Sequence, residues 1–491
     1  MSSTTQISTG EASARRVWED PLLAHVSGFR TGEDNLSYRI SAEEIRGKIP
    51  QDLHGIFLRN GPARNELAGQ PFGHWFDGDG CVHTFRIENG EVDYRCSFVK
   101  TPKYVDETAA NAVRYRSFGH NAPGGFFRNL HMPANAANTS IVYHGGKLLT
   151  LFEGGLPWRL DLDTLETMGP ENFDGALRGM DTFSAHGKLH PGTGDYFNFG
   201  MGGGLKGPQL SLYQISPQGK MAKRGAVSVD SMAFCHDNAM TENYLVFMVM
   251  PVTFSNILNV ILARDTIDRN MAFHPEEGMK VYVVSLEDFS LVRTFEVEPF
   301  MYAHSSNCWE RDGELYIDVV AMNDHDAEVG TAFSRNLFSQ PRPATGRLTR
   351  YRFNMATGAS SEEALPCALP CEFPQWDLRR TGSPSRYIYT VGICENETPG
   401  FYNALQRVDL ESGDVVVYDC GPGRYTSEPI FVPRNQGSDE SDGYILAVIY
   451  DANTALSELL ILDAASLADE IAVVPLRNHI PHGFHCGYTA L

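Results

Sequence analysis

The strongest constraint on the fold is a repeated pattern in which short apolar runs of strand type are separated by tight turns. In "TFRIENGEVDYR" (84–95), Asn89-Gly90 can adopt the positive φ values of a type I′ turn between two strands. The same pattern recurs at 211–221, 309–320, 407–419 and 440–451. Helical periodicity is scarce, and its best candidates, 255–270 and 464–471, are short. The chain is therefore predicted to be all-β.

The predicted strands have to share one closed architecture. A length of 491 residues suggests two or more domains. However, no Pro-, Gly- or Ser-rich linker divides the chain, and a β-propeller holds many blades around one axis. We expect a Ser/Thr/Ala-rich disordered tail at 1–17 and a single propeller over 18–491. The blades must be divergent, because no WD or kelch repeat is readable.

Charge and cysteine usage exclude several classes of partner. With 61 acidic and 40 basic residues the net charge is −21, which repels nucleic acid and anionic membrane surfaces. The nine scattered cysteines form no CxxC pair, which is typical of a reduced, cytoplasmic chain. No signal peptide and no run of eighteen apolar residues is present, and no obligate protein partner is indicated.

Four histidines stand in strand-like apolar surroundings: His186, His236, His304 and His485. Their separations of 50, 68 and 181 residues exclude a local metal motif. These separations suit one ligand from each of several blades, since seven blades give about 70 residues per blade. A single histidine in a strand is more often a satisfied core residue than a ligand. Spacing alone therefore does not establish a metal site.

Three glutamates, Glu153, Glu372 and Glu428, also lie among apolar residues. Buried carboxylates are rare unless paired, and a ligating imidazole usually donates its second N–H to a carboxylate. Salt bridges to Arg159 or Arg434 are the alternative. Imidazole ligands suit Fe, Zn, Cu or Ni, and four of them leave two octahedral positions for dioxygen or water. This arrangement favours redox iron over a zinc hydrolase.

At this point the sequence resembles the carotenoid cleavage oxygenase family, and within it the bacterial apocarotenoid-cleaving branch, from about residue 40 to the end. The ordered set of markers is specific. It comprises "IPQDLHGIFLRNGP" (49–62), "HWFDGDGCVHTF" (74–85), "FVKTPKYV" (98–105), "ANTSIVYHGGKLLTLFEGGLPWRLD" (137–161), "FSAHGKLHP" (183–191), "HDNAMTENY" (236–244), "CEFP" (371–374), "SEPIFVPR" (427–434) and "IPHGFHCGY" (480–488).

The resemblance implies an all-β, seven-bladed propeller with loops and short helices that cap one axial non-haem Fe(II). The four histidines would hold this iron and the three glutamates would support them. Thr139 falls where the family places a threonine whose methyl crowds one open coordination position. The implied reaction inserts dioxygen across one conjugated C=C bond of a carotenoid or apocarotenoid and releases two carbonyl products. No side-chain acid, base or nucleophile is required, which agrees with the lack of a GxSxG or P-loop motif.

A hydrophobic polyene also needs a tunnel and a way in. Aromatic residues beside the metal motifs could line the tunnel and stabilise a developing polyene cation, although plain packing is the alternative. They are Phe76, Phe152, Phe234, Tyr302 and Phe373. A second hypothesis is an apolar patch that contacts a membrane or micelle, against the alternative of ordinary core residues. It comprises Phe126, Phe127, Ile257, Leu258, Ile261 and Leu262.

Other functions remain open at this stage. A stilbene-cleaving branch uses a pocket tyrosine and lysine; Tyr104 matches the tyrosine, but no lysine stands near the expected position, Asn135. Nothing favours a third branch, which isomerises retinyl esters. A non-catalytic propeller scaffold would require structural histidines. A calcium-dependent propeller hydrolase would require clustered Asp and Asn ligands, which are not apparent.

The C-terminal "NHIPHGFHCGYTAL" (478–491) holds three of the sixteen histidines. Only His485 matches a ligand, and His479 and His482 are expected to be exposed or at the tunnel rim. Gly483 is expected to let the strand bend toward the axis. Cys486 stands where the family usually has glycine. The last strand is predicted to pair inside the ring instead of fraying.

Overall fold

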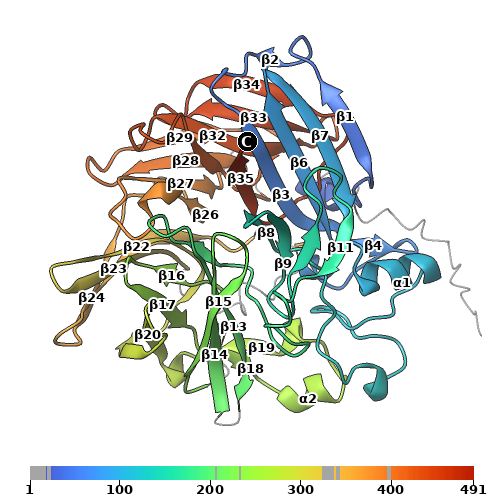
Figure 1. Ribbon diagram of the computed structural model, residues 1–491. Coiled ribbons are helices and arrows are strands. Elements are labelled where there is room, and N and C mark those ends of the chain that lie inside the picture. Colours follow the sequence, from blue (N-terminus) through green and yellow to red (C-terminus); the bar gives the residue numbers. More distant parts are fainter. Residues whose placement is uncertain are drawn as a thin grey trace, which may run out of the picture.

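The computed structural model describes residues 18, 24–204, 207–231, 234–322, 337–338, 343–394 and 400–491. The predicted disordered tail at 1–17 lies outside them. Strands dominate the described chain, and Figure 1 shows the sheets following one another around a common centre. The predicted all-β propeller is confirmed.

Antiparallel strands of the described residues form seven blades of four to six strands. Two of these blades share one eight-stranded sheet, joined only by the pair Gly346 and Cys371.

The first four blades run in chain order as follows. Blade 1 holds β1 (Leu36–Ile40), β7 (Glu91–Phe98), β6 (Asp79–Glu88), β3 (Gly55–Arg64) and β35 (Cys486–Ala490); blade 2 holds β8 (Ser140–His144), β9 (Lys147–Leu151), β10 (Trp158–Leu160) and β11 (Thr167–Pro170); blade 3 holds β12 (Lys188–Leu189), β13 (Tyr196–Gly204), β14 (Gly207–Ile215) and β15 (Met221–Ser228); blade 4 holds β16 (Ala239–Met240), β17 (Tyr244–Val249), β20 (Met279–Ser285) and β21 (Leu291–Val297).

The remaining three blades complete the ring. Blade 5 holds β22 (Met301–Arg311), β23 (Glu314–Met322), β24 (Gly346–Asn354) and β25 (Ser360–Ala364); blade 6 holds β26 (Cys371–Gln375), β27 (Tyr387–Gly392), β28 (Ala404–Asp409) and β29 (Val415–Asp419); blade 7 holds β30 (Arg424–Thr426), β31 (Ile430–Pro433), β32 (Gly443–Asp451), β33 (Leu456–Asp463), β34 (Glu470–Pro475) and β2 (Arg46–Gly47).

Short elements lie outside the blades. They are the hairpins β4 (Glu66–Leu67) with β5 (Gln70–Pro71) and β18 (Val252–Phe254) with β19 (Met271–Phe273), the helices α1 (Pro102–Ala110) and α2 (Ile257–Ile261), and the 3₁₀ turns η1 (Ala24–Phe29), η2 (Trp75–Asp77), η3 (Phe126–Arg128), η4 (Asp268–Asn270), η5 (Pro275–Glu277) and η7 (Leu378–Arg380). Within the described residues, no helix combines the length and the apolar character needed to cross a bilayer.

The two ends of the chain close the ring by crossing over each other. From the N-terminal side, β2 pairs with β34 of the last blade. The C-terminal β35 pairs with β3 of the first blade, from Gly55 opposite Ala490 to Arg59 opposite Cys486. The prediction that the last strand pairs inside the ring is therefore confirmed. Because this closure pairs β35 with β3, the edge of the terminal strand that faces β3 is not left unpaired.

Local turn signals predict some elements correctly and others wrongly. Glu88 pairs with Glu91 across Asn89 and Gly90, whose φ values of 53° and 80° are those of a type I′ turn. The helix predicted in 255–270 is only the short α2. The helix predicted at 464–471 is wrong: residues 464–469 form the turn between β33 and β34, residues 470–471 begin β34, and Leu467 has a left-handed φ of 53°.

The core is divided among the interfaces between neighbouring blades. Phe57 and Tyr94 of blade 1 pack with Leu446 of blade 7, and Phe199 of blade 3 packs with Phe247 of blade 4. Inner and middle strands are therefore buried on both faces, which explains their long apolar runs. Packing of this density fixes each inner strand, and with it the side chains that the strand turns toward the axis.

Candidate metal centre

The centre of the ring receives one ionisable side chain from each of the seven blades. In blade order they are His485 immediately before β35, Glu153 after β9, His186 before β12, His236 before β16, His304 within β22, Glu372 within β26 and Glu428 between β30 and β31. The seven residues identified from the sequence thus share one place, although up to 332 residues separate them.

The four imidazole rings form a compact cluster. The ring centroid of His186 lies 4.3 Å from that of His236, 5.1 Å from that of His304 and 4.6 Å from that of His485. His304 and His485 are 4.8 Å apart. One ring nitrogen from each of His186, His236 and His304 lies within 4.8 Å of the others, a spacing that suits a shared metal ion.

Three of the four imidazoles are held from behind by the glutamates. Nδ1 of His304 lies 2.6 Å from Oε2 of Glu372, and Nδ1 of His485 lies 3.1 Å from Oε1 of Glu428. His236 and Glu153 form a third pair through Nδ1. A carboxylate that accepts the Nδ1 proton directs Nε2 toward the centre and makes it more basic.

The alternative salt bridges for these glutamates do not form. Arg434 pairs with Asp52 and Asp442 instead, and no ion pair joins Arg159 to Glu153 in the described chain. Among the described residues, His236, His304 and His485 each pair with a glutamate, and His186 does not.

The surroundings shift the pKa values of these imidazoles in different directions. Burial, reinforced by the neighbouring imidazoles, lowers the pKa of His186 well below its usual value. Burial also lowers the pKa of His485, although Glu428 opposes it. For His304, burial acts in the same direction, but the charge and hydrogen bond of Glu372 outweigh it and raise the pKa. Neutral imidazole is the form that binds a metal.

The cluster fits a transition metal by its donor chemistry. The Nε2 atoms of His186 and His304 are buried and have no hydrogen-bond partner among the described residues. Unpaired buried polar atoms are costly, so a cation that accepts their lone pairs would remove that cost. Four nitrogen donors suit iron, zinc, copper or nickel far better than calcium.

A cavity of about 430 Å³ opens on one side of the imidazoles. Five predicted pocket residues line it: Phe76, Thr139, Phe152, Phe234 and Phe373. His236, His304 and His485 also line it. Its described lining contains no lysine or arginine, and most of it is aromatic or aliphatic. The size and lining of this cavity suit an apolar, uncharged molecule.

Tyr302 was also predicted in this pocket, and that prediction is wrong. Its side chain is only 1% exposed, and its hydroxyl lies 3.1 Å from the carbonyl oxygen of Asp237 and 3.0 Å from that of Met248. The pairing of β22 with β23 shifts between Tyr302 and Ser305. Because of this bulge, the two-residue alternation of a strand does not place Tyr302 on the side of His304.

Comparison with known proteins identifies the architecture. A family model described as retinal pigment epithelial membrane protein matches residues 29–490. The apocarotenoid-15,15′-oxygenase of Synechocystis is 34% identical over 93% of this chain and 94% of its own. The chain belongs to the carotenoid cleavage oxygenase family. A Crocus sativus carotenoid 9,10(9′,10′)-cleavage dioxygenase is 30% identical over 91% of this chain and 85% of its own.

Two further relatives broaden the comparison. An isoeugenol monooxygenase of Pseudomonas nitroreducens is 30% identical over 92% of this chain and 95% of its own. The crystal structure of the cobalt-substituted Synechocystis apocarotenoid oxygenase superposes with a TM-score of 0.88 at 31% identity, covering 95% of this chain and 98% of the other. This family fold therefore accommodates cobalt in a relative of known structure.

The other two C-terminal histidines were placed wrongly by the sequence. His482 is 4% exposed, stacks on Phe401 at 4.2 Å between centroids and bonds the carbonyl of His25 through Nε2 at 3.0 Å. His479 is half-buried, with Nε2 3.1 Å from the carbonyl of Arg30. Both are covered by the N-terminal turn η1 and its flank.

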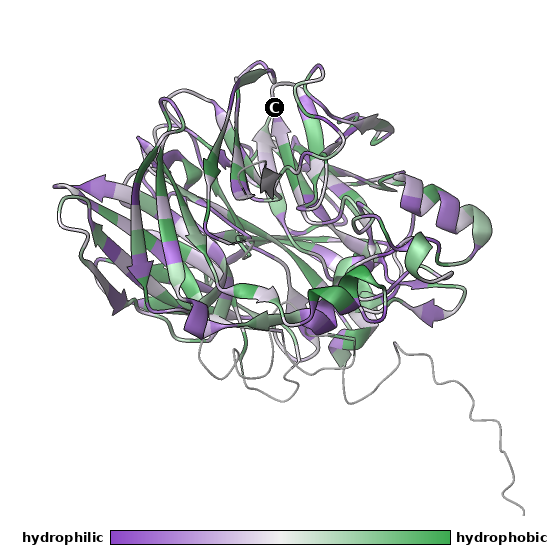
Figure 2. Cartoon of the chain, turned by 90° about the horizontal axis from the view of Figure 1, so that it is seen from below, coloured by the Kyte–Doolittle hydropathy of each residue, from purple (hydrophilic) through white to green (hydrophobic). Residues whose placement is uncertain are grey.

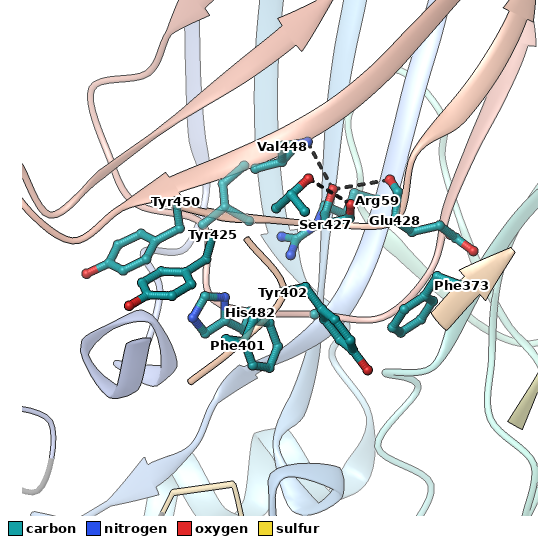
Figure 3. Close-up of a pocket in the computed structure, with 13 residues that line it drawn as sticks. Arg59, Phe373, Phe401, Tyr402, Tyr425, Ser427, Glu428, Val448, Tyr450 and His482 are labelled. Atoms are coloured by element: carbon teal, nitrogen blue, oxygen red, sulfur yellow. Dashed lines mark hydrogen bonds between the residues drawn. The ribbon is translucent and has the colours of Figure 1, made fainter. Parts of the chain in front are cut away.

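Figure 3 shows how His482 is separated from the metal centre. It lies with Phe401, Tyr425 and Tyr450 on one side of a small cavity, and Glu428 and Phe373 lie on the other. Beside it, Gly483 packs closely against Gly61: a Cβ on Gly61 would lie only 2.4 Å from the Cα of Gly483, so position 61 requires glycine.

Several lining residues escaped prediction. Phe484, which lines the cavity, directly precedes His485 in the sequence. Its place beside a predicted ligand could have identified it, as it did for Phe234, which stands two residues before His236. Trp75 lines it from η2 and Phe118 from a loop, and no periodic pattern marks either residue.

Proposed function

We propose that this chain is a non-haem Fe(II) dioxygenase that cleaves one conjugated C=C bond of a carotenoid or apocarotenoid into two carbonyl products. The observation that carries the proposal is a cluster of four imidazoles opening onto an apolar cavity. His186, His236, His304 and His485 would hold the iron. Iron in such a site supplies the binding and activation of dioxygen, the co-substrate.

The protein side chains would orient the ligand rings and exclude water from the site, and they would not transfer protons. Glu153, Glu372 and Glu428 hold three ligand rings by their Nδ1 atoms, and Thr139 lines the cavity where it can restrict access to the metal. The apolar lining keeps water from the reacting bond. Since no cationic side chain is in the described lining, a carboxylate substrate would be buried unpaired. Neutral polyenes such as aldehydes and alcohols are therefore preferred.

Cleavage of a phenolic styrene or stilbene double bond is the second candidate, favoured by similarity to isoeugenol monooxygenase. The side chains argue against it. The Tyr104 hydroxyl bonds Asp34 at 3.2 Å, and its ring stacks on Phe98 outside the cavity. Asn135, at the position expected for a lysine, donates instead to the carbonyl of Leu156. No described lining residue reproduces the tyrosine–lysine pair that would activate a phenol.

The apolar patch predicted for membrane contact comes from η3 and α2, which are close in sequence to residues of the cavity lining. Arg116 is buried and donates to the carbonyls of Asn129, next to η3, and Val260, in α2, so the two elements are held together. Met132 and Phe254 are exposed and also line the cavity. In Figure 2, which looks from below, α2 stands at the front in the green of hydrophobic residues.

We propose that hydrophobic substrate enters here from a membrane or micelle surface. Phe127 is 80% exposed and Leu258 is 63% exposed, so both can contact lipid without unfolding. With a net charge of −21, attraction to anionic lipid cannot replace this apolar contact. Phe127→Ser with Leu258→Ser should reduce sedimentation with neutral liposomes severalfold, whereas Leu291→Ser on the outer strand β21 should not. Unchanged sedimentation of the double variant would remove the proposal.

One experiment tests the reaction itself. Fe(II)-reconstituted protein is incubated with apocarotenals, isoeugenol and 4-hydroxystilbenes, and the products are identified by mass spectrometry. We expect two carbonyl products from apocarotenals. Cleavage of the phenolic compounds alone would establish the second candidate. Failure to bind iron together with failure to cleave any substrate would establish a non-catalytic scaffold.

A further inference from the structure

A close pair of cysteines lies beside the metal centre and takes no part in the proposed reaction. Cys367 and Cys371 stand in the connection from β25 to β26, with their Sγ atoms 3.6 Å apart. Pro366 and Pro370 precede each of them and restrict the loop. Cys371 is the first residue of β26, and the next residue is Glu372, the carboxylate that holds His304.

The two thiols differ in access. Cys367 is partly exposed, whereas Cys371 is buried. The other partly exposed thiols are those of Cys394 and Cys486, and burial raises the pKa of both. The pKa of Cys367 is lowered to about 7 by the hydrogen bond from Cys371, assisted by the backbone N–H of Leu348. Cys367 is thus the accessible cysteine with the most thiolate character.

Acidity alone gives Cys367 a small advantage. Its Sγ also lies 2.7 Å from the carbonyl oxygen of Leu369, a contact that favours the protonated thiol. Even with a pKa of about 7, its reaction rate at pH 7 exceeds that of an ordinary cysteine by only about threefold, because nucleophilicity falls as the pKa falls. The decisive feature is a second thiol within 3.6 Å, ready to trap the oxidised sulfur.

We propose that Cys367 and Cys371 are an oxidation site that forms a reversible disulfide on exposure to a hydroperoxide. The Cys367 thiolate attacks the terminal peroxide oxygen, the O–O bond breaks, and the leaving hydroxide takes a proton to give water and a sulfenic acid. The Cys371 sulfur then attacks Cys367 sulfur and expels a second water with the thiol proton. Two thiols lose two electrons in all, and hydrogen peroxide is reduced to two waters.

Formation of the disulfide would affect the metal centre through the backbone of β26. Its S–S bond of about 2.05 Å requires the sulfurs to approach by about 1.5 Å. Cys371 pairs with Gly392, so this approach strains the start of β26. Two residues later, Phe373 already has a left-handed φ of 50°. Because Glu372 lies between them, oxidation displaces the carboxylate that orients His304.

The modification is tested without any activity assay. Trypsin cuts after Arg352 and Arg379, and the peptide 353–379 contains both cysteines and no other. The reduced full-length protein is treated with increasing hydrogen peroxide, alkylated and mapped by mass spectrometry. We expect this peptide to lose two hydrogens and resist alkylation before any other cysteine reacts, and dithiothreitol to restore both thiols.

Variants separate the two steps. Cys371→Ser should leave a sulfenic acid on Cys367 that dimedone traps, and Cys367→Ser should abolish the reaction in this peptide. Cys394→Ser should leave disulfide formation unchanged. If both thiols of the wild-type peptide stay alkylatable while Cys394 is oxidised, the proposal is refuted.

The transmission to the metal rests on the proposed function and has its own readout. Cobalt(II) affinity is measured for the oxidised and reduced protein, and we expect oxidation to weaken it about tenfold, in the range found when a supporting group is lost. Cys371→Ser should show no such change on peroxide treatment. Equal affinity of the fully oxidised and reduced forms would refute the transmission, and absent cobalt binding in both would refute the metal site instead.

Discussion

Glu428 allows a sharp test of the metal centre because one carboxylate serves three donors. Its Oε1 accepts from Nδ1 of His485 at 3.1 Å and from Nε2 of Gln375 at 2.7 Å, and its Oε2 accepts from the backbone N–H of Cys486 at 2.6 Å. In Glu428→Gln the side chain keeps its size but presents one oxygen and one NH₂ group. Whichever way the amide turns, a donor then faces a donor.

The magnitude follows from these contacts. An unpaired buried donor costs about 1–3 kcal/mol, so the metal-free variant should lose that much free energy of unfolding. The imidazole of His485 also loses its anionic acceptor, and because of this loss the metal affinity should fall about 10- to 100-fold. This loss of affinity equals about 1.4–2.7 kcal/mol. The difference in unfolding free energy between the metal-loaded and the metal-free protein should decrease by the same amount.

The assay combines cobalt(II) titration against a competing chelator with urea unfolding, each with and without metal. Glu440→Gln is the matched control, because Oε1 of Glu440 accepts the backbone N–H groups of Arg386 and Tyr387 and a glutamine oxygen can keep both. The control should retain its metal affinity. If the affinity of Glu428→Gln stays within about threefold of the wild type, the carboxylate does not support the ligand and the reasoning is wrong.

Three further predictions concern single residues. His485→Ala should abolish metal binding measured by elemental analysis, whereas His482→Ala should keep it and lose about 3 kcal/mol of unfolding free energy for the emptied aromatic site. Burial holds the pKa of His482 well below 6.5, so the unfolded chain binds more protons than the folded chain at acid pH. The free energy of unfolding, measured with urea, should therefore be constant above about pH 7 and fall below pH 6.5 by up to about 1.4 kcal/mol per pH unit. The fall should be less steep in His482→Gln. Tyr302→Phe should lower the unfolding free energy by about 1–2 kcal/mol without changing substrate specificity, checked by product analysis, since its hydroxyl bonds the carbonyls of Asp237 and Met248 and is outside the cavity lining.

The sequence predicts the centre better than its surroundings, for a physical reason. A buried histidine or glutamate contrasts with the apolar strand that carries it, so His304 and Glu372 are visible in the chain. The burial of His482 depends instead on η1, more than 450 residues away, and no local pattern reports such a contact. Tyr302 was misplaced because a bulge breaks the strand alternation.

Helices show the same limit from another side. The segment 464–471 has helix-forming residues, yet the antiparallel register of β33 and β34 requires a tight turn there. By contrast, α1 was missed although its start is marked locally: the Thr101 side chain accepts from the N–H of Tyr104, and Pro102 occupies the first turn. Tertiary register overrides propensity in the first case, and a readable cap was overlooked in the second.

The order of residues around the ring makes the metal centre and ring closure interdependent. Glu372 and His304 come from neighbouring blades within one sheet, so their pair survives as long as that sheet does. Glu428 belongs to the last blade and His485 to the strand that completes the first, so their hydrogen bond crosses the seam where the chain ends meet. A ring that opens at this seam loses one ligand and its carboxylate together. A metal ion held by these residues would therefore stabilise closure directly, and any substitution that weakens the pairing of β35 with β3 would weaken its binding by the linked free energy.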